Sequence, residues 1–146
     1  MKKLLYSFLI LSSATVFAQT HSAVKFAVAN DIVGTVQMFT IRKAVVQSSV
    51  TYKNAATLPQ NLKKYSFLAQ NGLAEVKIKK GYEGLDRLTL AQINQQYNLA
   101  PETPVFIEGI EFPDTSVKVY ADIVQGNFEV KDHNGKKTLF ITHNTQ

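Results

Sequence analysis

The sequence contains no cysteine and no tryptophan. Without thiols the chain cannot form disulfide bonds even in an oxidising compartment, so we expect hydrophobic packing alone to hold its fold. A bacterial lipid anchor is attached to a cysteine, and we therefore expect none. Six tyrosines and nine phenylalanines supply core material, but a tryptophan platform for carbohydrate binding is missing.

Arginine is also scarce, since only positions 42 and 87 carry it. The formal net charge is +5, and removal of Lys2 and Lys3 with a leader peptide would lower it by two, to +3. Nucleic-acid phosphates are bound by clustered lysine and arginine. A mild charge of this kind therefore predicts no nucleic-acid partner.

The N-terminus reads "MKKLLYSFLILSSATVFAQT". Two lysines precede an apolar run, and Val16-Phe17-Ala18 places small or β-branched residues where a signal peptidase reads, so residues 1–18 are predicted to be a secretory signal peptide. A membrane-spanning helix is the alternative, but it needs about 20 apolar residues, and this run is shorter and interrupted by serine and threonine. We therefore expect residues 19–146 to form one domain that is periplasmic or released and does not span the membrane.

The first half of this domain combines strand and helix patterns. Residues 23–30 and 32–52 are rich in Val, Ile, Phe and Thr, which favours strands, although 38–46 could also form a helix. A proline near the start and a glycine near the end favour a helix within 57–73. Residues 74–80 alternate between apolar and charged side chains, which predicts a half-buried strand.

The second half begins with a capped helix. Thr89 and Gln92 have the spacing of a capping box, in which each side chain accepts a hydrogen bond from the other residue's main-chain N–H, so a short helix is predicted there. Residues 103–112 have strand composition, with a kink or turn at Gly109. Residues 114–126 fit either a short helical segment, which we favour, or a strand.

The chain closes on a predicted β-hairpin. Asn134-Gly135 is a strong signal for a two-residue turn, because both residues tolerate the positive φ that a type I′ turn requires. Residues then pair when their numbers sum to 269, so Phe128 faces Ile141 and Val130 faces Leu139, with all four on one buried side. The opposite side carries Glu129, Lys131, Thr138 and Phe140. We therefore expect an α+β fold: a small mixed or antiparallel sheet, two or three short helices, and a C-terminal hairpin whose last strand lies inside the sheet.

The common catalytic motifs G-x-S-x-G, H-E-x-x-H and G-x-G-x-x-G do not occur. Of the three histidines, His21 lies near the start of the mature chain, and His133 and His143 lie at opposite ends of the predicted hairpin, roughly 30 Å apart at about 3.3 Å per residue. The two later histidines cannot share a metal ion. Asp132 and His133 could form an acid–base dyad, but we favour solvated turn residues. No catalytic residue, metal or cofactor is predicted.

Charged side chains gather in two places where a partner could bind. Lys77 and Lys79 lie on the outward face of the predicted strand 74–80, either as an anion site or, as we favour, as a solvated face that discourages edge pairing. Acidic residues within 102–114 could form a glycosidase pair or a cation site, but they lack calcium-loop spacing, and loop charge is the favoured interpretation. The residues predicted to contact any partner are Lys77, Lys79, Glu108, Glu111 and Asp114.

Four pieces of the last third occur in a suggestive order: "PVFIEG", "FEVKD", "NG" and "LFIT". Within residues 104–142 the chain resembles the closing part of the plug domain of TonB-dependent outer-membrane transporters. It has Glu108 where that family prefers Asp, lacks the Tyr-Gly-rich insert between the last two strands, and is followed by no β-barrel. The resemblance implies a small α+β fold reused without its transporter as an envelope interaction module, and it carries over no catalytic residue.

From these observations we expect a non-catalytic binding or interaction module of the bacterial cell envelope, whose partner is an unidentified protein or envelope component. The alternative is a small secreted hydrolase with a site assembled from distant residues and His133 or His143 as its base. A third possibility is an envelope stability or assembly factor, which would co-purify with outer-membrane proteins.

The leader prediction can be checked by mass spectrometry after expression of the full chain in a bacterium. We expect the exported form to begin at Gln19, because the peptidase recognises the residues ending at Ala18. A full-length chain retained in the membrane fraction would contradict the prediction.

Overall fold

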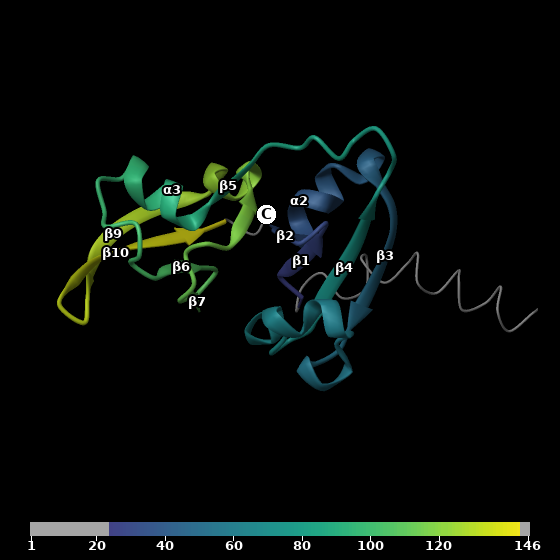
Figure 1. The fold of residues 1–146 in the computed structure, drawn as a ribbon, viewed down its shortest axis with the longest axis horizontal. Helices are drawn as coiled ribbons and strands as arrows, with labels where there is room; N and C mark the ends of the chain where they lie inside the picture. The colour runs from purple at the N-terminus through teal and green to yellow at the C-terminus, as the bar shows by residue number, and fades with distance from the viewer. Residues whose placement is uncertain (1–23, 144–146) are drawn as a thin grey trace, which may run out of the picture. The chain divides into compact units, whose positions relative to one another are not determined.

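The computed structural model describes residues 24–143, so the predicted signal peptide and His21 lie outside the described residues. Contacts divide the described chain into two compact units, where the sequence predicts one domain. The first unit comprises the residues up to Asn30 together with Gly34–Glu83, and the second comprises Asp31–Val33 and the residues from Gly84 onward. Figure 1 shows the elements of each unit along the chain.

Three strands form the sheet of the first unit. The order is β3 (Val46–Tyr52), β4 (Leu73–Ile78) and β1 (Phe26–Ala29), with β4 antiparallel to β3 and parallel to β1. β4 confirms the predicted alternation, since Val76 and Ile78 are buried and Lys77 is exposed. Lys77 thus lies on a solvated face, as favoured, but β4 has a neighbour on each side, so the expectation that this lysine protects a sheet edge was wrong.

The helix considered for residues 38–46 exists but begins earlier. α2 (Val36–Ile41) starts at Thr35, whose hydroxyl accepts a hydrogen bond from the Met38 N–H at 3.0 Å, and the 3-10 helix η1 (Lys43–Val45) follows it. A capping hydroxyl satisfies one of the otherwise unpaired N–H groups at a helix start. The stretch 32–52 is therefore a strand, two short helical pieces and a second strand.

The helix predicted within 57–73 is a 3-10 helix rather than an α-helix. After the short η2 (Ala55–Thr57), η3 (Gln60–Leu68) consists of two helical pieces that meet at a kink at Tyr65. It buries Leu62, Tyr65 and Leu68, as the apolar spacing indicates. Gly72 has φ of +103°, and a Cβ there would lie 2.9 Å from the Tyr52 carbonyl oxygen, so this position requires glycine.

The second unit contains a small sheet and a capped helix. Its strand order is β2 (Ile32–Thr35), β8 (Lys118–Tyr120) and β5 (Arg87–Thr89). α3 (Leu90–Gln96) follows β5, and both hydrogen bonds of the predicted capping box between Thr89 and Gln92 are present, at 3.1 and 2.8 Å. The ambiguous stretch 114–126 contains both a strand, β8, and a helical piece, the 3-10 helix η4 (Ala121–Gln125).

A second sheet in this unit has the order β7 (Ile110–Phe112), β6 (Val105–Ile107), β10 (Lys136–Thr142) and β9 (Asn127–His133). We call it the C-terminal sheet. β10 runs parallel to β6 and antiparallel to β9, so the last strand lies inside the sheet as predicted. The predicted register of the hairpin is also confirmed, because every β9–β10 pair sums to 269. The chain is thus an α+β protein with a C-terminal hairpin.

Val130, which was expected on the buried side of the hairpin, and Tyr97 are both partly exposed. Val130 is 40% exposed, because β9 is the outermost strand and has a neighbour on one side only. Tyr97 is 36% exposed and stacks on Phe128, with ring centroids 5.1 Å apart. This stack lies between the end of α3 and the start of β9, which lie close together in Figure 1.

The register of β10 can be tested by truncating one core side chain. Leu139 is fully buried, so Leu139→Ala should lower the free energy of unfolding by about 2–5 kcal/mol through lost burial and the cavity left behind. Lys137→Ala, on the same strand but exposed, should change it by less than about 0.5 kcal/mol. Urea unfolding followed by circular dichroism measures both, and equal effects would contradict the register.

Candidate functional site

The C-terminal sheet has one face in the core and one face turned outward. Leu139 and Ile141 are buried, while Phe140 between them is half-buried and belongs to the opposite face. β6 repeats this pattern, with Phe106 half-buried between two buried neighbours. Side chains alternate along a strand, so Phe106 and Phe140 share the outer face of the sheet.

Three rings cluster on this outer face. Phe106 and Phe140 are register partners on the parallel strands β6 and β10, and their rings stack with centroids 4.7 Å apart at 17°. His133 meets Phe106 edge-on at 4.9 Å and Phe140 at 6.0 Å. Ring pairs in these geometries attract one another beyond their buried area. The cluster therefore holds the two phenylalanine rings as one stacked apolar pair, which we call the platform.

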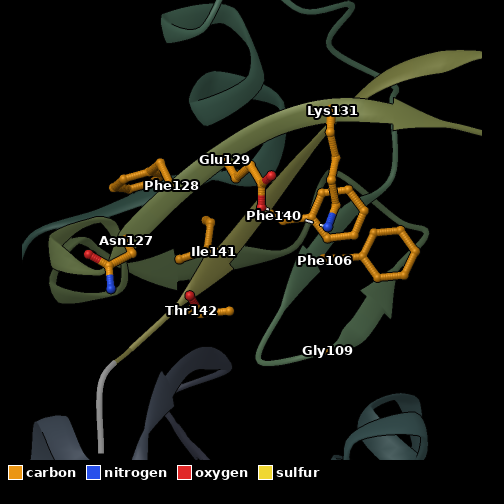
Figure 2. Close-up of a pocket in the computed structure, with 9 residues that line it drawn as sticks. All are labelled: Phe106, Gly109, Asn127, Phe128, Glu129, Lys131, Phe140, Ile141 and Thr142. Carbon is orange, nitrogen blue, oxygen red and sulfur yellow. Dashed lines mark ion pairs between the residues drawn. The ribbon is translucent and has the colours of Figure 1, made fainter.

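A charged pair lies beside this platform. Lys131 Nζ lies 4.3 Å from the centroid of the Phe140 ring and 3.7 Å from Glu129 Oε2. A cation over an aromatic face is stabilised by about 0.5–1 kcal/mol at an exposed site, and an exposed ion pair adds little. Together these contacts orient the lysine across the ring, as Figure 2 shows.

The platform forms part of a pocket of about 390 Å³. Figure 2 shows that both faces of the sheet contribute: Phe106 and Phe140 come from the outer face, and Phe128 and Ile141 come from the core face. The residues that line the pocket come from β6, β9, β10 and the β6–β7 turn: Phe106, Gly109, Asn127, Phe128, Glu129, Lys131, Phe140, Ile141 and Thr142. Its lining combines apolar and polar side chains, and its volume lies within the range of ligand-binding pockets.

The turn between β6 and β7 is tied to the end of β10. Glu108 and Gly109 both have positive φ, +53° and +79°, and Glu108 is a residue type that rarely adopts this conformation. Glu108 Oε1 accepts a hydrogen bond from the His143 main-chain N–H at 2.7 Å and lies 2.7 Å from His143 Nδ1. Both side chains are more than four-fifths buried. Charge-assisted contacts of this kind offset the strain of the turn.

The second ring nitrogen of His143 is also engaged. Nε2 lies 3.1 Å from the Ile123 carbonyl oxygen, which can only accept a hydrogen bond. A Cβ on Gly126 would lie 2.9 Å from Nε2 and 2.6 Å from the Thr142 carbonyl oxygen, so only glycine allows this close packing. We call Glu108, His143 and the Ile123 carbonyl the histidine clamp. The clamp holds the β6–β7 turn and η4 against the end of β10.

The two ring nitrogens of His143 are both directed at atoms of the clamp. A base needs one ring nitrogen directed at the group that it deprotonates, but both nitrogens of His143 face acceptors of the clamp. His133 lies at the hairpin turn, as expected, with Nε2 3.4 Å from Asn134 Nδ2 and its ring against the platform. The His133 ring thus packs against the platform, and the His143 ring belongs to the clamp.

The five predicted contact residues do not form one cluster. Lys77 and Lys79 lie in the first unit, on β4 and just after it. In the second unit, Glu108 belongs to the clamp and Glu111 pairs with Phe106 across β6 and β7, which puts Glu111 on the outer face beside the platform. Asp114 accepts hydrogen bonds from the Ser116 hydroxyl and N–H, which lower the pKa of its carboxyl group.

Across residues 24–143 no group of three or more His, Cys, Asp or Glu side chains could hold a metal ion. Within the same residues, no helix has the length and apolar character needed to cross a membrane. Comparison with protein-family models, curated proteins and solved structures finds no match for this chain. The resemblance to a transporter plug domain therefore stays a prediction.

The sequence indicated half of the platform. The hairpin register places Phe140 on the outer side with Glu129 and Lys131, and this is where the structure has it. Phe106 was missed, because its partnership with Phe140 depends on a parallel pairing between strands about thirty residues apart in the sequence. The available signal in the sequence was the run Val105-Phe106-Ile107. Side chains of a strand alternate between its two faces, so the middle residue of three apolar residues points away from the face that the other two bury.

The histidine clamp can be tested with a double-mutant cycle. His143→Ala should lower the free energy of unfolding by about 1–3 kcal/mol, because it leaves buried acceptors unpaired. Glu108→Ala should lower the free energy of unfolding further, because Glu108 Oε1 also accepts a hydrogen bond from the His143 main-chain N–H. The variant also keeps the positive φ of the turn without the contacts that offset it. The double variant should cost less than the sum of the two.

Glu111→Ala is the control for this cycle, because Glu111 is an exposed glutamate of the same β6–β7 hairpin. It should change the free energy of unfolding by less than about 0.5 kcal/mol. Strict additivity of the two clamp substitutions in urea unfolding would show that the side chains are not coupled.

Proposed function

We propose that this protein is an exported, non-catalytic binding module of the bacterial cell envelope. The platform of Phe106 and Phe140 would receive an apolar side chain from a partner protein. The observation that carries the proposal is the stacked phenylalanine pair, which lies partly exposed on the outer face of the C-terminal sheet and borders the pocket. Export is supported by the sequence pattern of the first eighteen residues.

The chemistry of the pocket favours a protein partner. Aromatic side chains contribute most strongly to interfaces when a partner completes their burial, and a polar rim excludes water around them. Lys131 and Glu129 place one charge of each sign next to the platform. A partner segment with an aromatic or aliphatic side chain flanked by polar groups fits this arrangement better than a highly charged ligand does.

The non-catalytic part of the proposal is supported by the histidine clamp. A hydrolase that used His143 would need Nε2 to face a nucleophile or a water molecule, whereas here it faces the Ile123 carbonyl oxygen. The geometry favours a structural role for this residue.

Selection of peptides from a random displayed library tests the binding site. We expect enriched peptides to share an aromatic or aliphatic residue, and to bind Phe106→Thr at least about tenfold more weakly, a loss of roughly 1.4 kcal/mol of binding free energy. Threonine keeps the strand propensity of the position. Tyr82→Thr is the matched control, because Tyr82 is an exposed aromatic residue of the first unit.

Three outcomes would contradict the proposal. Selection could enrich no peptide, or the enriched peptides could bind Phe106→Thr as tightly as the parent protein. The parent protein could also hydrolyse ester, peptide or glycoside substrates and lose that activity in His133→Ala or His143→Ala. Circular dichroism of each variant checks that the fold is retained.

A further inference from the structure

The outer edge of the C-terminal sheet is β9, a strand of seven residues. Among residues 24–143 it is the last strand in the sheet order and pairs with β10 alone, and six of its seven residues are exposed. We propose that two copies of this chain pair edge to edge along β9, antiparallel, with a two-fold axis at Val130. The proposal goes beyond the binding module: it depends on the open edge of β9 and not on the platform, although Glu129 and Lys131 border both.

The hairpin turn determines which main-chain groups of β9 face the open edge. In a two-residue hairpin the residues that flank the turn, His133 and Lys136, exchange hydrogen bonds, and every second pair beyond them does the same. Phe128, Val130 and Asp132 therefore direct their N–H and C=O groups away from β10. These three residues present the hydrogen-bonding pattern of an unpaired antiparallel strand.

The charges of β9 are complementary to themselves in one register. With the two-fold axis at Val130, residues of the two copies pair when their numbers sum to 260, so Glu129 of each copy faces Lys131 of the other. These side chains lie on the same face and sit in non-hydrogen-bonded positions, where opposite side chains approach most closely. Two Glu129–Lys131 ion pairs, related by the two-fold axis, therefore form across the interface.

Neighbouring registers lack this complementarity. An axis at Glu129 sets two glutamates opposite each other, and an axis at Lys131 sets two lysines opposite each other. Like charges directly opposite on paired strands are destabilising. Only the Val130 register avoids them while it also covers the exposed Val130 side chain.

Glu129 and Lys131 can exchange partners at little cost. Within one chain they contact each other at 3.7 Å, with side chains 67% and 51% exposed, so their pair is solvated and weak. In the dimer, the Glu129–Lys131 contact within each of the two chains is replaced by a Glu129–Lys131 contact between the chains. In the dimer the two outer faces lie on the same side of a continuous sheet, so both platforms point the same way.

A charge-reversal cycle tests the proposal on protein purified after export of the full chain. Sedimentation equilibrium over a concentration series should show a reversible dimer for the parent protein. Glu129→Lys and Lys131→Glu should each weaken dimerisation on the order of tenfold, because each creates two like-charge pairs. The double reversal should restore it, and an equimolar mixture of the two single variants should form heterodimers.

Cysteine cross-linking provides a second readout, because the parent chain has no thiol. Val130→Cys should give a disulfide-linked dimer under mild oxidation, since opposite Cα atoms in a hydrogen-bonded antiparallel pair lie about 5.5 Å apart, within disulfide range. Val50→Cys is the matched control: Val50 is 48% exposed on β3, an edge strand of the first unit that carries no charge. It should cross-link far more slowly.

A monomer at every concentration, a double reversal that does not restore dimerisation, or equal cross-linking of the two cysteine variants would overturn the proposal. Phe106→Thr separates it from the proposed function. That variant should lose peptide binding and keep the dimer, whereas the single charge reversals should lose the dimer.

Discussion

The alternation of side chains along β10 determines both the core and the outer face of the C-terminal sheet. Leu139 and Ile141 fill the core, and Phe140 between them forms half of the platform. A slip of one residue against β6 or β9 would expose the two aliphatic side chains and bury the ring. The same register that stabilises the unit therefore also sets the position of the candidate site.

The end of β10 is held by a contact that does not follow from strand pairing. Glu108 adopts a conformation that glycine or asparagine would adopt more easily, yet its carboxylate is needed where it is, because it accepts from both the main chain and the ring of His143. Gly126 completes the arrangement by leaving room for that ring. A locally unfavourable turn is thus kept by contacts from residues distant in the sequence, and it positions Gly109 at the pocket.

The predictions that succeeded rest on local chemistry. The Asn134-Gly135 turn and the Thr89–Gln92 capping box each involve residues within a few positions of one another, so a short stretch of sequence contains all the information. The fold class followed from such elements. The pairing of β6 with β10, the histidine clamp and the Phe106–Phe140 stack join residues twenty or more positions apart, and no periodicity indicates which segments meet.

An exposed edge strand must avoid indiscriminate pairing, and charged side chains are a common solution. β9 differs from β3 in this respect: β3 has no charge along its seven residues, while β9 carries both signs. Charges of a single sign would repel every copy of the same strand, whatever the register. Alternating signs repel in some registers and attract in one, so the side chains that limit aggregation of β9 can also select a single partner and a single alignment.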